Sequence, residues 1–173
     1  MLEQDGLKIR ALEPEDLSHL LKWENDPAFW TFSQQRIPYS EYLLKEYLKE
    51  AGKDLFEAGQ LRMVICYEDQ GIGLVDLFDF DPDHQRAGIG ILIGAADYQG
   101  QGLAKKALKL FLSYAFPNFN LQQVYAQVVP DNEASIQLFR ACGFQEAGVL
   151  KNWFRQGDRF LDAIQFQFLK TDL

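Results

Sequence analysis

The chain has 173 residues, and its 17 Lys and Arg residues against 25 Asp and Glu residues give a formal net charge of −8. This length predicts one domain, here residues 1–173, with enough interior to fold without disulfides or metal ions. The hydrophobic content of 47% argues against disorder, and the acidic balance disfavours broad contact with nucleic acid or anionic membranes.

Two cysteines, Cys66 and Cys142, lie far apart with no CxxC pattern, so neither a disulfide framework nor a zinc site is indicated. Residues 1–6 lack the basic and apolar regions of a signal peptide, and the run 88–96 is too short to span a bilayer. We expect a cytoplasmic protein without a bound metal.

The first third of the chain reads as a strand and two helices. A strand is predicted over 7–11, and a helix starts at Pro14 and ends at 25–27. Ser40 is placed to cap a second helix with an apolar stripe. The loop between the two helices carries three aromatic residues: Phe29, Trp30 and Phe32.

The remainder alternates between strands and helices. The apolar patterns predict strands over 61–68, 72–80, 86–94, 121–129, 149–154 and 160–169, and helices from 103 to about 116 and over 132–142. Residues 117–120 should break the first of these helices, and Gly143 should end the second. We expect an α/β (α+β) fold with a mixed, mostly antiparallel twisted sheet of about six to seven strands and helices on both faces.

A glycine-bearing loop follows the strand over 86–94 and opens the next helix. Unpaired N–H groups and the helix dipole favour an anion there, and glycines let a phosphate approach the backbone. Neither the Walker A pattern nor the dinucleotide fingerprint fits, and a simple tight turn remains an alternative. The residues predicted to bind the anion are Gln99, Gly100, Gln101, Gly102, Leu103, Ala104 and Lys105.

A second group lies on the helix over 132–142. Spacings of three and four residues place Asn132, Ser135 and Phe139 near one face. They are candidates for ligand binding. Alternatively, Asn132 caps the helix, Ser135 satisfies a backbone group and Phe139 belongs to the core.

Together, the two elements resemble the GNAT superfamily of acetyl-CoA-dependent N-acetyltransferases. Gln99-x-x-Gly102-x-Ala104 is similar to its pyrophosphate loop, and Asn132-x-x-Ser135 to its second cofactor helix. The opening segment over 7–26 resembles the branch that contains ribosomal-protein N-terminal acetyltransferases and spermidine N-acetyltransferases.

The resemblance implies where acetyl-CoA binds. The cofactor site falls mainly within 86–144, and the acceptor side within 12–60 and 145–170. The backbone of Ile91, Leu92 and Ile93 is expected to pair with the cofactor's pantetheine arm, and the N–H of Ile93 to stabilise the oxyanion.

An amine must lose a proton before it attacks, so a carboxylate acting through water is expected nearby. Asp76, Asp79 and Asp81 are the candidates. Asp76 and Asp79 should face opposite sides of a regular strand, and we favour Asp76. The alternative for each of the three is a solvated turn or edge carboxylate without a catalytic role. His84 is interpreted as a loop residue.

Phe139 stands where many relatives carry a tyrosine that protonates the leaving thiolate. Three accounts follow: slower catalysis, a donor elsewhere such as Tyr98 or Cys142, or a non-catalytic acyl-CoA-binding sensor or partner protein. Because the other motifs are intact, we favour catalysis.

The expected acceptor is a primary amine, on either a small molecule or a protein N-terminus. Residues 33–37 are not acidic, so the net charge does not by itself indicate a polyamine. The aromatic loop and Tyr39 are candidates to line the acceptor pocket or to form core. Four acidic residues lie on the acceptor side: Glu24, Asp26, Glu41 and Glu46. They either provide negative charge for the acceptor pocket or form a solvated helix face. Homo-oligomerisation is left open.

Overall fold

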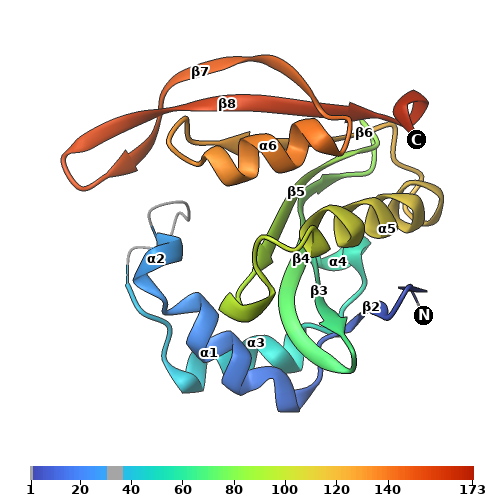
Figure 1. Ribbon diagram of the computed structural model, residues 1–173, viewed down its shortest axis with the longest axis vertical. Helices are drawn as coiled ribbons and strands as arrows, with labels where there is room; N and C mark the ends of the chain where they lie inside the picture. The colour runs from blue at the N-terminus through green and yellow to red at the C-terminus, as the bar shows by residue number, and fades with distance from the viewer. Residues whose placement is uncertain (1, 31–36) are drawn as a thin grey trace.

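The computed structural model describes residues 2–30 and 37–173, which form a single eight-stranded sheet with helices on both faces (Figure 1). The strand order is β1-β2-β3-β4-β5-β6-β8-β7. Neighbouring strands are antiparallel except for β5 and β6, which are parallel. The strands are β1 (Leu2–Gln4), β2 (Leu7–Ala11), β3 (Leu61–Tyr67), β4 (Gln70–Asp81), β5 (Arg86–Ile93), β6 (Gln123–Val128), β7 (Gln145–Gln156) and β8 (Arg159–Leu169).

The described residues also form six α-helices and three short 3₁₀ turns, which connect the strands except for the last turn, which follows β8. They are α1 (Leu17–Glu24), α2 (Pro27–Trp30), α3 (Glu41–Glu50), α4 (Leu55–Ala58), α5 (Leu103–Asn118) and α6 (Glu133–Ala141), with the turns Pro14–Asp16, Ala96–Tyr98 and Lys170–Asp172. None of the helices in the described ranges is both long and apolar enough to cross a membrane.

The predicted mixed, mostly antiparallel sheet is confirmed, with several differences in detail. The short β1, α2 and α4 were not expected, and β1 brings the strand count to eight. Part of the predicted aromatic loop is helical up to Trp30, whereas Phe32 lies outside the described residues. Pro117 does not break α5, because it sits in the last turn. β7 starts at Gln145, four residues before the predicted strand.

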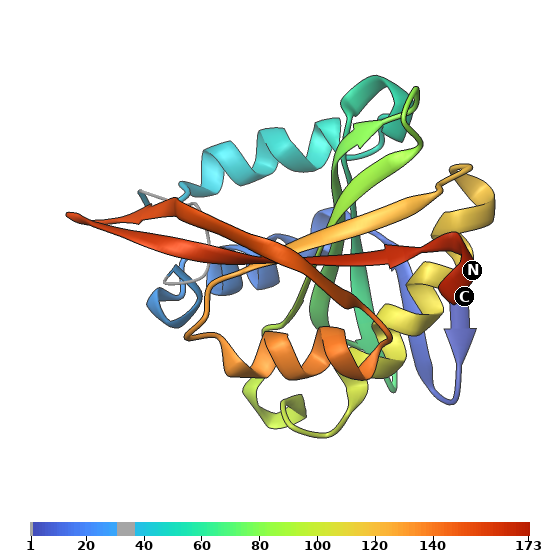
Figure 2. The same ribbon diagram turned by 90° about the horizontal axis from the view of Figure 1, so that it is seen from above.

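The core has two parts because successive residues of a strand point to opposite faces. Val64 and Leu74 lie in a cluster with Leu44 of α3 and with residues of α1. The neighbouring Ile65 and Val75 belong to the larger cluster that α5 covers. Figure 2 shows α3 and α5 on opposite sides of the sheet.

The parallel pair β5–β6 is short and then opens. The register joins Arg86 to Gln123 and ends where Gly88 meets Tyr125. Beyond that point β5 continues along β4 as far as Ile93, while β6 continues along β8. Figure 2 shows β7 and β8 crossing the direction of β3, β4 and β5 at a large angle. The sheet therefore splits into two arms that diverge from Gly88.

Candidate active site

A cavity of about 670 Å³ lies where β5 and β6 separate, and we call it the cleft cavity. Its backbone end is formed by β5, the loop and first turn of α5, and α6; its charged end is formed by α1, α2, β3 and β4. Of the residues predicted to bind the cofactor, the cavity wall contains Ile91, Leu92, Ile93, Gln99, Gly100, Gly102, Leu103, Ala104, Lys105, Asn132, Ser135 and Phe139. Gln101 is not part of this wall, and its side chain donates to the carbonyl of Asp97.

The edge of β5 that faces β6 presents main-chain groups. The carbonyl of Ile93 accepts a hydrogen bond of 2.8 Å from the side-chain amide of Gln99 rather than from the sheet. The N–H and C=O of one strand residue point to the same edge, and the direction repeats every second residue. The N–H groups of Ile93 and Ile91 therefore face the opening, where an extended ligand can pair with them.

The N-terminus of α5 opens on the same cavity. Gly100 and Gly102 have φ angles of 71° and 76°, and a Cβ at either position would meet open space. Backbone geometry, not crowding, is therefore what favours glycine. Gly102 is the N-cap and supplies no side-chain hydrogen bond, so the first N–H groups of the helix remain free for a ligand's phosphate.

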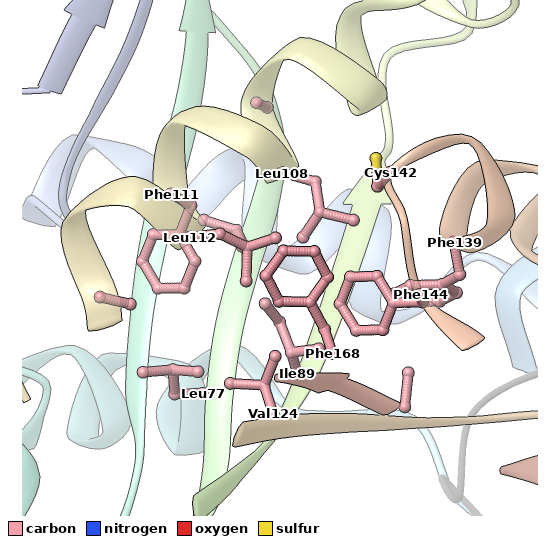
Figure 3. Packing of buried hydrophobic residues seen from close by; sticks show 14 of the residues in the cluster. Leu77, Ile89, Leu108, Phe111, Leu112, Val124, Phe139, Cys142, Phe144 and Phe168 are labelled. Carbon is pink, nitrogen blue, oxygen red and sulfur yellow. The ribbon is translucent and has the colours of Figure 1, made fainter. Parts of the chain in front are cut away.

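The predicted residues of α6 combine structural and cavity-lining roles. Asn132 caps the helix, its Oδ1 accepting from the backbone N–H of Ser135 at 3.1 Å. The Phe139 side chain is 4% exposed, and its ring centroid lies 4.9 Å from that of Phe144 and 5.8 Å from that of Phe166. Figure 3 shows Phe139 beside Phe144 in this core. Asn132 therefore caps the helix and Phe139 belongs to the core, and both residues also line the cavity.

The two proton donors considered as replacements lie differently. Cys142 is buried, its Sγ lies 3.9 Å from the carbonyl oxygen of Lys105, and it does not appear in the cavity wall. Burial raises the pKa of its thiol. Tyr98 does line the cavity, but its hydroxyl donates to Oε1 of Gln70 at 3.1 Å.

An ionic cluster occupies the charged end. Arg62 of β3 donates from Nε and Nη2 to the two oxygens of Asp76, at 2.7 and 3.0 Å, and from Nη1 to Glu24 of α1. Its guanidinium also lies 5.6 Å from the ring centroid of Tyr47. Burial alone would lower the pKa of Arg62, but the charges of Asp76 and Glu24 outweigh it and raise the pKa further above its usual range.

The Asp76 carboxylate lies against β5. Asp76 pairs with Gly90 in the sheet, and a Cβ built on Gly90 would be 3.8 Å from Oδ2 of Asp76. This places the favoured carboxylate in the cavity wall, next to the strand with free main-chain groups. The contact between Asp76 and Arg62 was not predicted from the sequence.

The other candidate carboxylates lie elsewhere. Asp79 has a φ of 48° within an irregular stretch between Phe78 and Asp81, so the argument from a regular strand fails there. Asp79 and Asp81 nevertheless line a different cavity from Asp76. His84 is an exposed turn residue, as predicted.

The predicted acceptor side is only partly represented in the cavity. Phe29 and Glu24 line it, together with Trp23 and Phe154, which lie within the ranges predicted for the acceptor side but were not named individually. Tyr39 is half-buried and exchanges two hydrogen bonds between its backbone and the Asn25 side chain.

The remaining acceptor-side candidates fall into two groups. Asp26 accepts from the backbone of Ala28, and Glu41 and Glu46 form exposed ion pairs, so they act as a cap and a solvated face. The Trp30 side chain, Phe32 and residues 33–36 lie outside what the structure describes.

Arg62 was not predicted as a site residue, although it interrupts an otherwise apolar strand. Glu24 was predicted as one possible source of negative charge on the acceptor side, but its pairing with Arg62 was not predicted. The sequence specifies no partner for either residue, because the three charged residues come from three elements separated along the chain. Within the described ranges, no group of His, Cys, Asp and Glu side chains is arranged to hold a metal ion.

Comparisons with known proteins give a consistent result. Residues 7–145 match the model of the acetyltransferase (GNAT) domain. A spermidine N(1)-acetyltransferase of Escherichia coli K12 is 31% identical over 160 residues, covering 92% of this chain and 84% of the relative. A putative ribosomal N-acetyltransferase of Bacillus subtilis is 25% identical, covering 97% of this chain and 93% of the relative.

A solved structure is similar along nearly its whole length. The crystal structure of spermidine N-acetyltransferase from Vibrio cholerae in complex with CoA and spermine has a TM-score of 0.87 and 28% sequence identity. The match covers 98% of this chain and 98% of that chain.

Proposed function

The chain belongs to the GNAT acetyltransferase family, and from this premise we propose that it transfers an acetyl group from acetyl-CoA directly to a primary amine in the cleft cavity. One observation carries the proposal: the free edge of β5 and the uncapped N-terminus of α5 line the same cavity. An extended chain that ends in a pyrophosphate needs both features, which matches the shape and charge of acetyl-CoA.

The residues proposed to bind the cofactor act mainly through the main chain. The N–H groups of Ile91 and Ile93 face the opening, and the Ile93 N–H is the proposed oxyanion donor. The first N–H groups of α5 receive the pyrophosphate, and Lys105 at the cavity wall adds a positive charge. Gln99 holds the last carbonyl of β5 and so fixes the end of this edge.

Asp76 is the proposed proton acceptor for the amine, through water. Both of its oxygens already accept from Arg62, but each keeps a second lone pair. Arg62 therefore fixes the orientation of the carboxylate while leaving it able to accept one more hydrogen bond. Arg62 itself stays charged, because its pKa is raised by the two carboxylates it contacts.

Acetyl-CoA supplies the acetyl group as a thioester, and the thiol that it releases has a pKa of about 8.5. The thiolate can therefore leave without a strong acid to protonate it. Phe139 has no proton to give, and Cys142 is not in the cavity wall. We therefore propose that the reaction proceeds without a thiol or phenol acting from α6.

Thiol release from acetyl-CoA, measured across a panel of primary amines, tests this function. The panel should include spermidine, butylamine and a peptide with a free N-terminus. Turnover well above the hydrolysis rate with at least one amine is expected, and small-molecule amines should be the better acceptors, since the relatives named above include spermidine acetyltransferases. Tight acetyl-CoA binding with no turnover on any amine would contradict catalysis and favour a sensor.

A further inference from the structure

Glu24, the last residue of α1, is the third member of the ionic cluster, and the reaction as proposed gives it no role. Its side chain is 17% exposed and lines the cleft cavity together with those of Arg62 and Asp76. Two ionised carboxylates cannot hydrogen-bond to each other, so Glu24 acts on Asp76 through Arg62 and through its own charge.

The guanidinium of Arg62 is divided between the two carboxylates. Its Nε and Nη2 donate to the two oxygens of Asp76, and its Nη1 donates to Glu24. The ring of Tyr47 from α3 lies against the guanidinium, with 5.6 Å between the ring centroid and Cζ of Arg62. The guanidinium plane is thus held at both ends and on one face, and the Asp76 carboxylate is held with it.

Asp76 occupies the middle of a row that crosses three strands. It pairs with Arg62 of β3 on one side and with Gly90 of β5 on the other. A Cβ built on Gly90 would be 3.8 Å from Oδ2 of Asp76, so the missing side chain leaves room beside this oxygen. The carboxylate is therefore held by Arg62 on one side and borders the cavity on the other.

Two charges of opposite sign act on the Asp76 carboxylate. A nearby cation such as Arg62 favours the ionised carboxylate and makes it a weaker proton acceptor, whereas a nearby carboxylate such as Glu24 makes it a stronger one. Because the side chains of Arg62, Glu24 and Asp76 are 24%, 17% and 25% exposed, water screens these charges only in part. The charge of Glu24 therefore offsets the effect of Arg62 on Asp76.

The neighbouring titratable group on α3 does not disturb this balance. Tyr47 faces the cluster, and burial raises the pKa of its phenol, so it stays neutral over the pH range in which carboxylates titrate. On the β5 side, the cross-strand neighbour of Asp76 is Gly90, which carries no charge. Among these neighbours, Arg62 and Glu24 are the charged groups that set how readily Asp76 takes up a proton.

We infer that Glu24 is a positioning residue that acts through Arg62 and keeps Asp76 able to accept the proton of the amine, an inference that rests on the proposed function. In this step the ammonium gives a proton to water and the water gives one to Asp76. The electrons of the broken N–H bond remain on the nitrogen as the lone pair that attacks the thioester carbon. Without Glu24, the guanidinium would act on Asp76 unopposed and would hinder the transfer.

Glu24→Gln tests the inference, because it removes the charge and keeps the length of the side chain. The readout is kcat/KM against pH with butylamine, a monoamine, so that contacts to a second ammonium group do not enter. Asp76 should stay ionised to lower pH, which moves the acidic limb of the profile down by about one pH unit. The plateau of kcat should fall about threefold, since a weaker base removes the proton more slowly.

Two further variants separate the charge of Glu24 from its structural contribution. Glu24→Asp keeps the charge and should leave the acidic limb near the wild-type position. Glu50→Gln is the matched control, because it deletes the same charge from a side chain of α3 that is 62% exposed and outside the cavity wall. An acidic limb in Glu24→Gln that stays in place or moves to higher pH would overturn the inference, as would an equal shift in either of the other two variants.

Failure of the proposed function gives a different pattern. Wild-type protein would then release no thiol with any amine of the panel. Titration of the Asp76 side-chain carboxyl carbon by NMR still decides the inference: a midpoint at lower pH in Glu24→Gln than in wild type and Glu50→Gln supports it, and equal midpoints in all three overturn it.

Discussion

The two ends of the cleft cavity are built from different groups. The backbone end uses main-chain N–H groups of β5 and α5, with glycines chosen for their φ angles. The charged end uses the side chains of Glu24, Arg62 and Asp76, which come from α1, β3 and β4. The backbone end therefore depends on local geometry, whereas the charged end depends on contacts between segments that are distant in the sequence. Substitutions at the two ends should therefore fail in different ways.

Gly102→Glu should give the largest effect, a loss of more than about 100-fold in acetyl-CoA affinity. The variant places a negative charge at the N-terminus of α5 and forces a side chain to adopt a φ of 76°. Isothermal titration calorimetry measures the loss.

Gly59→Glu is the control for backbone strain, because Gly59 has a φ of 69°, open space around its Cβ and no place in the cavity wall. Its affinity should equal that of wild type. If both variants lose affinity equally, the phosphate assignment is wrong.

Arg62→Met tests the charged end and should lower the free energy of unfolding by about 2 kcal/mol, because Glu24 and Asp76 lose their shared cation. The side chains of Arg62, Glu24 and Asp76 are 24%, 17% and 25% exposed, so water relieves part of the cost. Urea denaturation at neutral pH gives the value.

The control for this variant is Arg140→Met, which breaks an ion pair to Glu146 with side chains 50% and 42% exposed. It should cost less than about 1 kcal/mol. Equal losses in both variants would mean that the cluster at the charged end is no more than a surface ion pair.

Asp16 anchors the start of α1, the helix that carries Glu24. It accepts from Arg10 at 2.7 and 2.8 Å and from the backbone N–H of Glu13 at 2.8 Å, with its side chain 4% exposed. Burial would raise its pKa, but the hydrogen bonds from Arg10 and Glu13 outweigh burial and lower the pKa below 3.8. The stability from this ionised group is thus present above the unfolded pKa and is lost as the pH falls through the folded pKa.

Asp16→Asn should therefore lower the free energy of unfolding by about 1.5 kcal/mol at neutral pH. Urea denaturation repeated at falling pH should show the gap to wild type narrowing below about pH 4. A gap that stays constant with pH would contradict the assignment of a lowered pKa.

Phe139→Tyr is a change at the backbone end, and it should have the smallest effect on stability and activity. The ring lines the cavity but is packed against Phe144 and Phe166, so a new hydroxyl should cost about 1 kcal/mol of stability. We expect kcat in the folded variant to be no lower than that of wild type. A large fall in kcat would show that the phenyl ring has a positive role.

The backbone end of the cavity could be predicted from the sequence more completely than the charged end. The helices and strands around the backbone end were placed well, because glycine spacing, the Asn132 cap and alternating apolar residues are local signals. The loop and first turn over 99–105 were predicted to form part of a binding site, and all of these residues except Gln101 line the cavity.

Contacts between distant residues could not be predicted in this way. The bidentate pairing of Arg62 with Asp76 depends on the register of β3 against β4, and the contact with Glu24 depends on how α1 packs on the sheet. The irregular backbone at Asp79 likewise has no clear local signal. Side-chain partners at the charged end were therefore missed even though Asp76 was chosen.

Amide hydrogen exchange tests most directly whether main-chain groups of β5 and α5 hold acetyl-CoA. Saturating acetyl-CoA should slow exchange at Ile91, Ile93 and the residues that open α5, Leu103 to Lys105, relative to the free protein. Unchanged exchange at these amides, with protection appearing elsewhere, would contradict the account.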